Sequence, residues 1–285
     1  MSYFEGKVAV VTGAGSGIGR ALANALNAAG CVLELSDINR EALEETTAGL
    51  GRKDLECKTE RVDVADRHGV EQWAANIGAR RGHVDIVVNN AGVAMGGTAE
   101  ENRIEDIEWL MGINFWGVVY GCKAFLPLLH NSGGGHLVNI SSVFGIIGVP
   151  SQSAYNAAKF AVRGYTEALR QEQHIAATGL HVCCVHPGGV TTNIARSARS
   201  FGDEEQHAAL ADRFEQMTRT SPDSAAQQIL AAMERRKPRL LIGRDAKIIT
   251  LISRLFPASY PKVLALLGGK DVKELVASER TASSQ

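Results

Sequence analysis

The residues with the clearest chemical potential lie between Ser141 and Lys159, in the stretch SSVFGIIGVPSQSAYNAAK. Tyr155 and Lys159 are four residues apart in an Ala-rich context that favours a helix, which places both side chains on one face. A free phenol ionises near pH ~10, but a neighbouring ammonium group lowers the pKa of the phenol. Tyr155 is therefore a candidate general acid and base. The same spacing also occurs on ordinary surface helices, so the assignment depends on the rest of the chain.

Two further polar residues stand where they can assist that chemistry. Ser142 follows a buried strand expected at His136–Ile140, so its hydroxyl lies at a strand's C-terminal end and could polarise a substrate oxygen. Asn114 lies in an otherwise apolar helix expected at Ile104–Leu129, where a buried amide needs hydrogen-bond partners. The amide either bonds to the protein alone or holds a water molecule that passes protons.

A glycine-rich turn follows a short β-branched run at Lys7–Thr12 that is typical of a buried strand. An Ala- and Leu-rich helix is expected directly after it, at Arg20–Ala29. Glycines let the backbone approach a ligand, and the free N–H groups at the helix start favour a pyrophosphate. The spacing is GxxxGxG and not GxGxxG, and a purely structural turn is the alternative. The candidate dinucleotide-binding residues of the turn are Gly13, Ser16, Gly17, Ile18 and Gly19.

Asp37 ends a second strand expected at Cys31–Leu35, eighteen residues after Gly19. A carboxylate at this position accepts hydrogen bonds from the two ribose hydroxyls of an adenosine. It also repels a 2′-phosphate, by about 1 kcal/mol in water and up to about 4 kcal/mol at an effective dielectric constant near 20. This favours NAD over NADP, although Arg40 could reach a phosphate. Asp37 could also merely cap the helix expected at Arg40–Leu50.

Strand and helix patterns alternate along most of the chain. Such alternation implies parallel strands that bind ligands at their C-terminal ends. The sequence therefore predicts an α/β fold, a Rossmann-type doubly wound parallel sheet of about seven strands, with helices on both faces and a C-terminal helical extension. Further strands are expected near Glu60–Val62, Val84–Val88, His181–Pro187 and Arg239–Ile242, with an amphipathic helix at Arg67–Ala79.

Two loops at strand ends complete the expected binding edge. The fourth strand ends in NNAG, where small and amide-bearing residues suit close packing against a cofactor, although a plain loop is the alternative. The sixth strand opens into PGGVTT, a turn beside which a nicotinamide could rest. The candidate residues are Asn90, Ala91 and Gly92 in the first loop, and Pro187, Gly188, Val190 and Thr192 in the second.

The composition excludes several classes of function. Charged residues make up 21% of the 285 residues and the net charge is −1, so nothing favours nucleic-acid binding. The five cysteines are odd in number and lack metal-ligand spacing, which predicts reduced thiols, no metal site and a cytoplasmic protein. The N-terminus has no secretion-signal pattern, and no apolar run reaches the ~20 residues of a transmembrane helix.

Taken together, the motifs resemble those of the short-chain dehydrogenase/reductase family. They occur in the family's order, which makes the likeness specific, and they extend over about residues 7–243. Asn156 stands where a smaller residue is common, and we expect this departure to affect nothing essential. The motifs are TGAGSGIG at Thr12–Gly19, NNAG at Asn89–Gly92, Ser142 thirteen residues before Tyr155, YNAAK at Tyr155–Lys159, and PGGVTT.

The resemblance implies an NAD(P)-dependent oxidoreductase that interconverts a secondary alcohol and a ketone by hydride transfer. Tyr155 would be the acid and base, Lys159 would lower its pKa and bond the nicotinamide ribose, and Ser142 would orient the substrate oxygen. Asn114 would hold a proton-relay water. The further contacts implied are those of Asp63 and Val64 with the adenine, Asn90 with the adjoining ribose region, and Val190 and Thr192 with the carboxamide.

The residues that could wall a substrate pocket are apolar, which predicts a small hydrophobic alcohol or ketone. The helices around Gly117–Leu129 and Ala157–Leu169 carry apolar residues on more than one face, and such helices pair subunits in the family, so we expect a homodimer or homotetramer. A non-catalytic protein that senses dinucleotides is the alternative on the same fold. The pocket candidates are Met95, Phe144, Val149, Ile194 and Phe201.

We expect the chain to have two parts. Residues 1–243 form the dinucleotide-binding domain with a mobile helical substrate lid at about 193–220, and residues 244–285 form a helical extension with a disordered tail. Residues 246–267 mix apolar runs with Lys247, Arg254 and Lys262. A weak membrane-surface contact, a docked partner, a cap on the substrate pocket or an oligomer interface would each account for this pattern.

Overall fold

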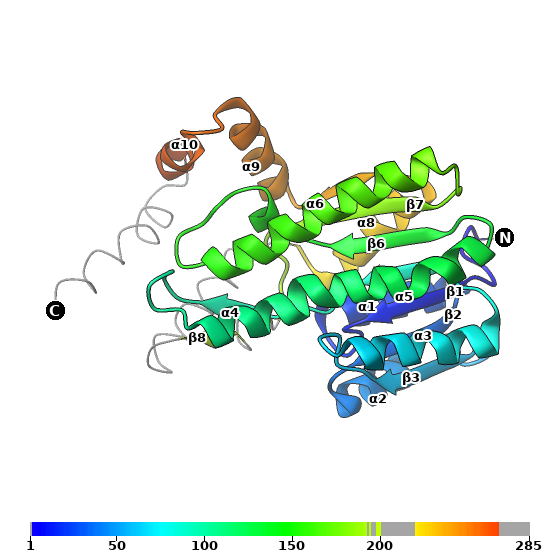
Figure 1. The fold of residues 1–285 in the computed structure, drawn as a ribbon. Helices are drawn as coiled ribbons and strands as arrows, with labels where there is room; N and C mark the ends of the chain where they lie inside the picture. Colours follow the sequence, from blue (N-terminus) through cyan, green and yellow to red (C-terminus); the bar gives the residue numbers. More distant parts are fainter. Residues whose placement is uncertain (1, 193, 195–197, 201–219, 268–285) are drawn as a thin grey trace.

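The computed structural model describes residues 2–192, 194, 198–200 and 220–267 (Figure 1). One parallel sheet with helices on both faces forms the body of the protein, which confirms the predicted α/β fold. In spatial order, the strands of this sheet are β3 (Cys57–Arg61), β2 (Val32–Asp37), β1 (Val8–Thr12), β4 (Ile86–Asn89), β6 (His136–Ile140), β7 (His181–Pro187) and β9 (Arg239–Ile242).

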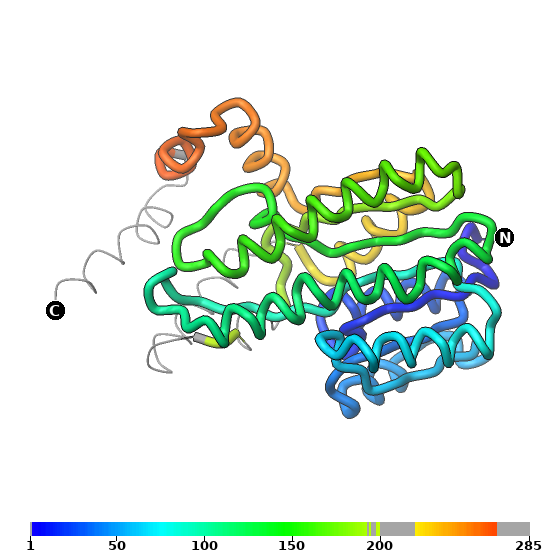
Figure 2. The backbone as a smooth tube through the Cα atoms, viewed as in Figure 1, coloured from blue at the N-terminus to red at the C-terminus, as the bar shows by residue number. Residues whose placement is uncertain are grey.

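The helices that flank the sheet run alongside its strands (Figures 1 and 2). They separate into two groups, because the buried residues of the two groups belong to different hydrophobic clusters. One face is covered by α1 (Gly17–Ala28), α2 (Arg40–Gly49) and α8 (Pro222–Glu234), and the other by α3 (Arg67–Arg81), α5 (Gly117–Asn131) and α6 (Ser153–Ile175).

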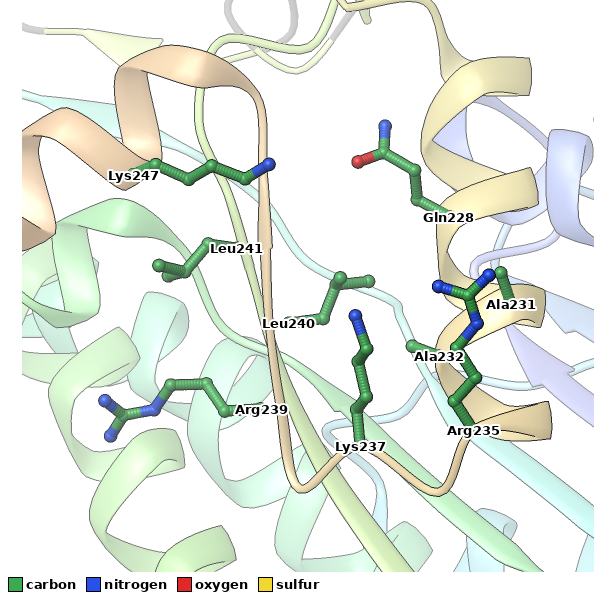
Figure 3. A pocket seen from close by; sticks show the side chains of 9 residues that line it. All are labelled: Gln228, Ala231, Ala232, Arg235, Lys237, Arg239, Leu240, Leu241 and Lys247. Atoms are coloured by element: carbon green, nitrogen blue, oxygen red, sulfur yellow. The ribbon is translucent and has the colours of Figure 1, made fainter.

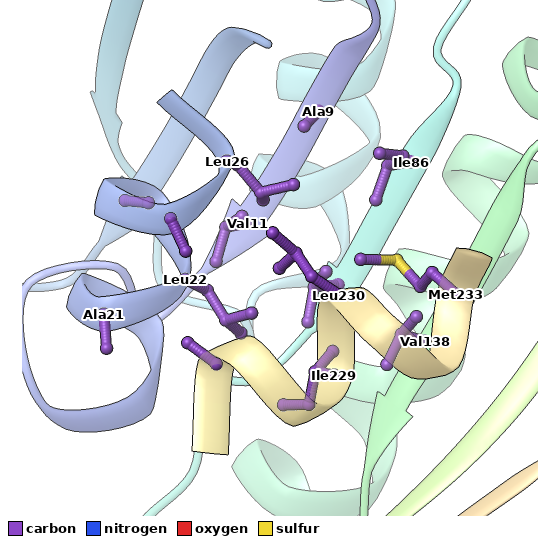
Figure 4. Packing of buried hydrophobic residues seen from close by; sticks show 14 of the residues in the cluster. Ala9, Val11, Ala21, Leu22, Leu26, Ile86, Val138, Ile229, Leu230 and Met233 are labelled. Carbon is purple, nitrogen blue, oxygen red and sulfur yellow. The ribbon is translucent and has the colours of Figure 1, made fainter. Parts of the chain in front are cut away.

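Each face of the sheet has its own hydrophobic core. On one face, Leu22 of α1 and Leu230 and Met233 of α8 belong to one hydrophobic cluster (Figure 4). On the other, Trp73 of α3 packs edge-on against Phe125 of α5, with ring centroids 5.3 Å apart. Because both faces are covered, all of β1 is buried, as expected of a central parallel strand.

Strand boundaries agree with the sequence to within two residues, except at the start of β3. β6, β7 and β9 begin and end where predicted. β3 starts at Cys57, earlier than the predicted Glu60–Val62, because this edge strand is largely exposed and lacks the apolar run that marks a central strand. β4 begins at Ile86, two residues later than expected.

The strand order reverses beside β1. The chain passes from β1 to β2 and β3 toward one edge, then returns to the other side of β1 and extends through β4, β6, β7 and β9 toward the opposite edge. Open α/β sheets bind ligands outside the C-terminal ends of the strands at such a reversal. The glycine turn follows β1 and the NNAG loop follows β4, so the fold brings both predicted loops to this point.

The apolar helix predicted at Ile104–Leu129 is one continuous helix with a widened turn in its middle. α4 (Ile104–Met111) passes into a π-helical turn (Gly112–Trp116), and α5 follows directly. Such turns frequently lie at functional sites, and Asn114 lies in this one. By length and composition the helix could cross a membrane, but its inner face belongs to the core, as in soluble proteins.

Beyond β9 the chain forms α9 (Arg244–Leu255) and α10 (Tyr260–Leu267), which stand off the C-terminal ends of the strands (Figure 1). A short pairing of β5 (Met95–Gly96) with β8 (Arg199–Ser200) was not predicted. Most of the predicted lid at 193–220, with Phe201, and the predicted disordered tail lie outside the described residues.

Candidate active site

Ser142, Tyr155 and Lys159 lie together at the C-terminal end of β6. Ser142 follows the last residue of that strand by two positions, and α6 carries Tyr155 and Lys159 one turn apart. The Ser142 side chain lies near enough to the Tyr155 phenol to lower the pKa of the phenol by hydrogen bonding. The Nζ of Lys159 lies 5.6 Å from the centre of the Tyr155 ring. The fold therefore brings the hydroxyl, the phenol and the amine into one cluster.

Lys159 is almost completely buried, with 3% of its surface exposed. Its Nζ donates a hydrogen bond to the carbonyl of Ile140 over 3.1 Å. A Cβ added at Gly92 would lie 3.5 Å from this Nζ and 3.2 Å from the Oδ1 of Asn114, so the NNAG loop packs closely on both. Burial lowers the pKa of Lys159 to about 8, because the charged amine loses its hydration.

Burial also reverses the acidity that we expected for Tyr155. The pKa of Tyr155 is raised to about 12, because a buried phenolate would lose its hydration, and the hydrogen bond with Ser142 offsets only part of this effect. The sequence had predicted a pKa lowered by Lys159, but desolvation sets the direction of the shift and the amine does not offset it. Tyr155 is therefore a neutral phenol near pH 7, ready to donate a proton.

Asn114 is fully buried and braces the loop that follows β4. Its Oδ1 accepts from the amide of Val93 and its Nδ2 donates to the carbonyl of Val93, both over 2.8 Å. Of the two alternatives for this amide, bonding to the protein accounts for both polar atoms of the side chain. A proton-relay water at Asn114 stays a prediction.

Asn156 holds the loop that carries Ser142. Its Nδ2 donates to the carbonyls of Phe144 (2.7 Å) and Ile147 (2.8 Å), and its Oδ1 accepts from the amide of Val149 (3.0 Å). An alanine here would make none of these bonds. Asn156 therefore braces this loop, a role that we did not predict, and its departure from the family pattern was the available signal.

A neutral histidine on β7, His186, fixes the backbone of Ser142 to the sheet. The Nδ1 of His186 donates to the carbonyl of Ser142 over 3.0 Å, and burial lowers the pKa of His186 to about 4. The ring is therefore uncharged near pH 7, and this bond requires the tautomer with the proton on Nδ1. The Ser142 Oγ also accepts from the amide of Phe144 over 3.1 Å.

The glycine turn is packed so tightly that side chains are excluded. A Cβ added at Gly13, whose φ is +65°, would lie 2.7 Å from the Cα of Ala91, and one added at Gly19 would lie 2.0 Å from the carbonyl oxygen of Gly13. Asn90 Nδ2 donates to the carbonyls of Thr12 (3.0 Å) and Gly13 (3.2 Å). Asn90 therefore joins the NNAG loop to the glycine turn. Its contact with the ribose region stays a prediction.

Asp37 lies against the glycine turn at the end of β2. Its Oδ2 accepts from the amide of Gly15 over 2.9 Å, and its Oδ1 accepts from the amide of Asn39 over 3.0 Å. The cap of α2 is Asn39, whose Oδ1 accepts from the amide of Ala42 over 2.9 Å. Asp37 is thus not merely the helix cap. Arg40 is exposed on the first turn of α2.

The remaining predicted contacts lie around the same edge. Val64 is buried, and a Cβ added at Gly117 would lie 2.9 Å from it. Asp63 is exposed and accepts from the amide of Ala65 over 2.9 Å. A Cβ at Gly17 would lie 3.1 Å from the methyl group of Thr192, so the PGGVTT turn reaches the glycine turn. Ser16 is exposed, Ile18 and Gly188 are half-buried, and Pro187 and Val190 are buried.

Two residues of the C-terminal extension contact the loops of this site, and the sequence offered no signal for either. Asp245, in the first turn of α9, accepts from the amide of Gly189 over 2.8 Å. Tyr260, at the start of α10, accepts from the amide of Gly148 over 2.8 Å through its Oη. The extension is therefore joined both to the PGGVTT turn and to the loop between Ser142 and Tyr155.

The apolar pocket candidates divide between the cluster and its surroundings. Phe144 packs edge-on against the Tyr155 ring, with centroids 6.1 Å apart, and Met95 is buried. Val149 and Ile194 are half-buried.

A separate surface groove of about 340 Å³ lies between α8 and β9 (Figure 3). Its lining includes the cationic residues Arg235, Lys237 and Lys247 and none of the predicted site residues.

Comparison with known proteins agrees with this geometry. The short chain dehydrogenase family matches residues 7–203. SadH of Mycobacterium tuberculosis is 46% identical over 93% of this chain and 96% of its own. The crystal structure of a short chain dehydrogenase/reductase from Burkholderia phymatum in complex with NAD superposes with a TM-score of 0.83, at 30% identity over 90% of this chain and 95% of that one.

A third relative carries a different cofactor. The alcohol dehydrogenase of Thermococcus sibiricus, complexed with 5-hydroxy-NADP, superposes with a TM-score of 0.71 at 27% identity, over 84% of this chain and 96% of its own. The match over residues 7–203 and the identity with SadH over 93% of this chain together assign the family. The chain belongs to the short-chain dehydrogenase/reductase family of oxidoreductases.

Proposed function

We propose that this protein is an NAD-dependent dehydrogenase/reductase that interconverts a secondary alcohol and a ketone on a small hydrophobic substrate. The observation that carries the proposal is the cluster of half-buried Ser142 and Tyr155 with the buried Lys159. A protein that only senses a dinucleotide has no need of a phenol placed beside a hydroxyl and near a buried amine.

The residues of the glycine turn and its neighbours fit a dinucleotide. Gly13 and Gly19 leave the backbone open to close approach, and the start of α1 supplies unpaired amides suited to a pyrophosphate. Asp37 presents a carboxylate at the end of β2, the position suited to ribose hydroxyls. When bound, NAD would accept or supply the hydride.

The reacting protons would be handled by the protein. In the direction of reduction, Tyr155 donates its proton to the carbonyl oxygen, and that oxygen becomes the hydroxyl of the alcohol product. The Ser142 hydroxyl holds the same oxygen in line with Tyr155. The phenolate left on Tyr155 is stabilised by the Lys159 ammonium, and the reverse direction returns the proton to Tyr155.

The first prediction concerns the proton donor. Tyr155→Phe should abolish turnover of secondary alcohols while NADH affinity stays within a few-fold of the wild type, because the ring still packs and only the hydroxyl is lost. Steady-state rates with a panel of secondary alcohols, followed as NADH absorbance, and NADH binding by calorimetry check this. Retained turnover in the variant would disprove the role of Tyr155.

The second prediction concerns the buried amine. Because the pKa of Lys159 is lowered from 10.5 to about 8, the folded state disfavours the charged form, and this cost is fully present below pH 8. The cost disappears as the pH rises toward 10.5, so the wild type should gain about 2 kcal/mol of stability relative to Lys159→Met between pH 7 and 9.5.

Urea unfolding of both proteins at the two pH values measures this difference. Lys237→Met removes an exposed lysine, which water solvates in the folded and unfolded states alike, and should show no such change. An equal difference between wild type and Lys159→Met at both pH values would show that the amine is not buried as described.

The third prediction concerns cofactor choice. Asp37 should favour NAD over NADP in kcat/KM by a factor of roughly 5 to 150, the equivalent of about 1 to 3 kcal/mol, and Asp37→Ala should shrink this preference. Kinetics with both cofactors on wild type, Asp37→Ala and Arg40→Ala decide the matter. A wild type that prefers NADP, with the preference erased in Arg40→Ala, would reverse the assignment of NAD.

The fourth prediction concerns assembly. Trp116 of the π-helical turn and Phe160 of α6 are 47% and 40% exposed, on the helices expected to pair subunits. We propose a homodimer or homotetramer through this face, in a protein that acts in the cytoplasm. Light scattering at micromolar concentration should give a multiple of the 30.4 kDa chain, and Trp116→Glu should lower it. A wild-type monomer would refute the proposal.

A further inference from the structure

Helices α9 and α10 are fixed to the body of the protein near the candidate active site. Asp245 accepts from the amide of Gly189, and Tyr260 both accepts from the amide and donates to the carbonyl of Gly148. Ala246 and Ile252 of α9 are buried. The extension is therefore packed on the domain. It lies beyond the C-terminal ends of the strands, where the predicted site is (Figure 1).

The outer side of this extension is unusually apolar. Leu251 and Leu255 of α9 are four residues apart and Ile248 is three before Leu251, so the three side chains form a stripe on one side of the helix. The link between the two helices and α10 itself also expose apolar side chains. The exposed fractions are 55% for Ile248, 58% for Leu251, 63% for Leu255, 46% for Phe256 and 75% for Leu266.

The same segment carries a strong excess of positive charge. Residues 244–267 contain four cations and one carboxylate, and the four cations are exposed. The single carboxylate belongs to Asp245. It accepts a hydrogen bond from the amide of Gly189, and among the described residues no ion pair joins it to these four cations. The cations are Arg244, Lys247, Arg254 and Lys262.

We propose that residues 244–267 dock the protein on the surface of a membrane that contains anionic phospholipids. A helix that joins an exposed apolar stripe to lysine and arginine side chains is suited to the boundary between headgroups and acyl chains. The apolar side chains leave water there, and each cation near an anionic leaflet adds to the binding. The docking goes beyond the proposed reaction and does not depend on it.

The charge argues against a second copy of this chain on the same surface. A two-fold contact sets one patch against itself, so Lys247 and Arg254 of the two copies would face like charges across an apolar interface. An anionic bilayer supplies the opposite charge without that repulsion. The orientation that results places the strands' C-terminal edge, where the predicted substrate site lies, toward the bilayer.

Cosedimentation of the full-length protein with vesicles tests the docking. Wild type should sediment with vesicles of phosphatidylcholine containing phosphatidylglycerol, weakly with phosphatidylcholine alone, and less at raised salt. The triple variant Lys247→Gln, Arg254→Gln, Lys262→Gln should bind the anionic vesicles roughly 100-fold more weakly. The double variant Leu251→Ser, Leu255→Ser should bind these vesicles at least about tenfold more weakly, because a smaller apolar surface is then transferred from water into the bilayer.

Matched controls remove the same groups elsewhere. Lys53, Lys58 and Lys123 are exposed cations away from the groove that Lys247 lines, and changing all three to Gln should leave vesicle binding unchanged. Ile175→Ser removes a side chain that is 83% exposed at the end of α6 and should also bind as wild type. Only variants whose melting temperature equals that of the wild type enter the comparison, so that a loss of binding is not a loss of folding.

Several results would overturn the proposal. Wild type that stays in the supernatant with the anionic vesicles would do so, as would control variants that lose binding to the same extent as the extension variants. A change of mass in light scattering for Leu251→Ser, Leu255→Ser without vesicles would show that the stripe joins copies of the chain. The charge variant alters only exposed residues, so it tests the docking even where the leucine variant folds poorly.

Discussion

The burial of the Lys159 amine is the constraint on which the rest of the site depends. An amine with 3% of its surface exposed needs a partner, and the carbonyl of Ile140 at the end of β6 provides one. α6 must therefore lie over β6 in one register. The same register sets Tyr155 one turn away, next to Ser142. The NNAG loop packs directly on Lys159 and Asn114, since a Cβ at position 92 would lie 3.2 Å from the Oδ1 of Asn114 and 3.5 Å from the Nζ of Lys159.

Three asparagine amides hold the loops around this cluster. An amide donates and accepts at once, so it can satisfy both the N–H and the C=O groups of a loop that has no sheet partner. Asn114 does this for Val93, and Asn156 does it for the loop after Ser142. Asn90 uses its two N–H groups on the glycine turn. The loops are thus fixed before any ligand arrives, as a preorganised site requires.

Much of this could be predicted from the sequence, and the exceptions have physical causes. Buried strands such as β1 and β7 carry apolar runs, whereas β3 at the edge does not, so its start was misplaced. The residue types and spacing of Tyr155, Lys159 and Ser142 indicated the cluster, because their placement follows from one strand and one helix. The π-helical turn left no pattern, since it adds one residue to an otherwise regular apolar helix.

Properties that depend on tertiary packing could not be predicted. Spacing alone indicated that Lys159 would acidify Tyr155, but the sign of the shift depends on how much water each group loses. The contacts of Asp245 and Tyr260 join residues 56 and 112 positions apart. No local pattern reports such pairs. The family model ends at residue 203, so it carries no expectation for the contacts of the extension.

The central claim is that Tyr155 is a neutral phenol and the proton donor of the site. Nuclear magnetic resonance of protein labelled with ¹³C at the tyrosine Cζ, with Tyr155→Phe to assign the signal, measures its ionisation directly. The structure predicts a phenol signal that stays unchanged through neutral pH in the protein without cofactor, in keeping with a pKa near 12. A Tyr155 signal that already shows the phenolate at pH 7 would contradict the account.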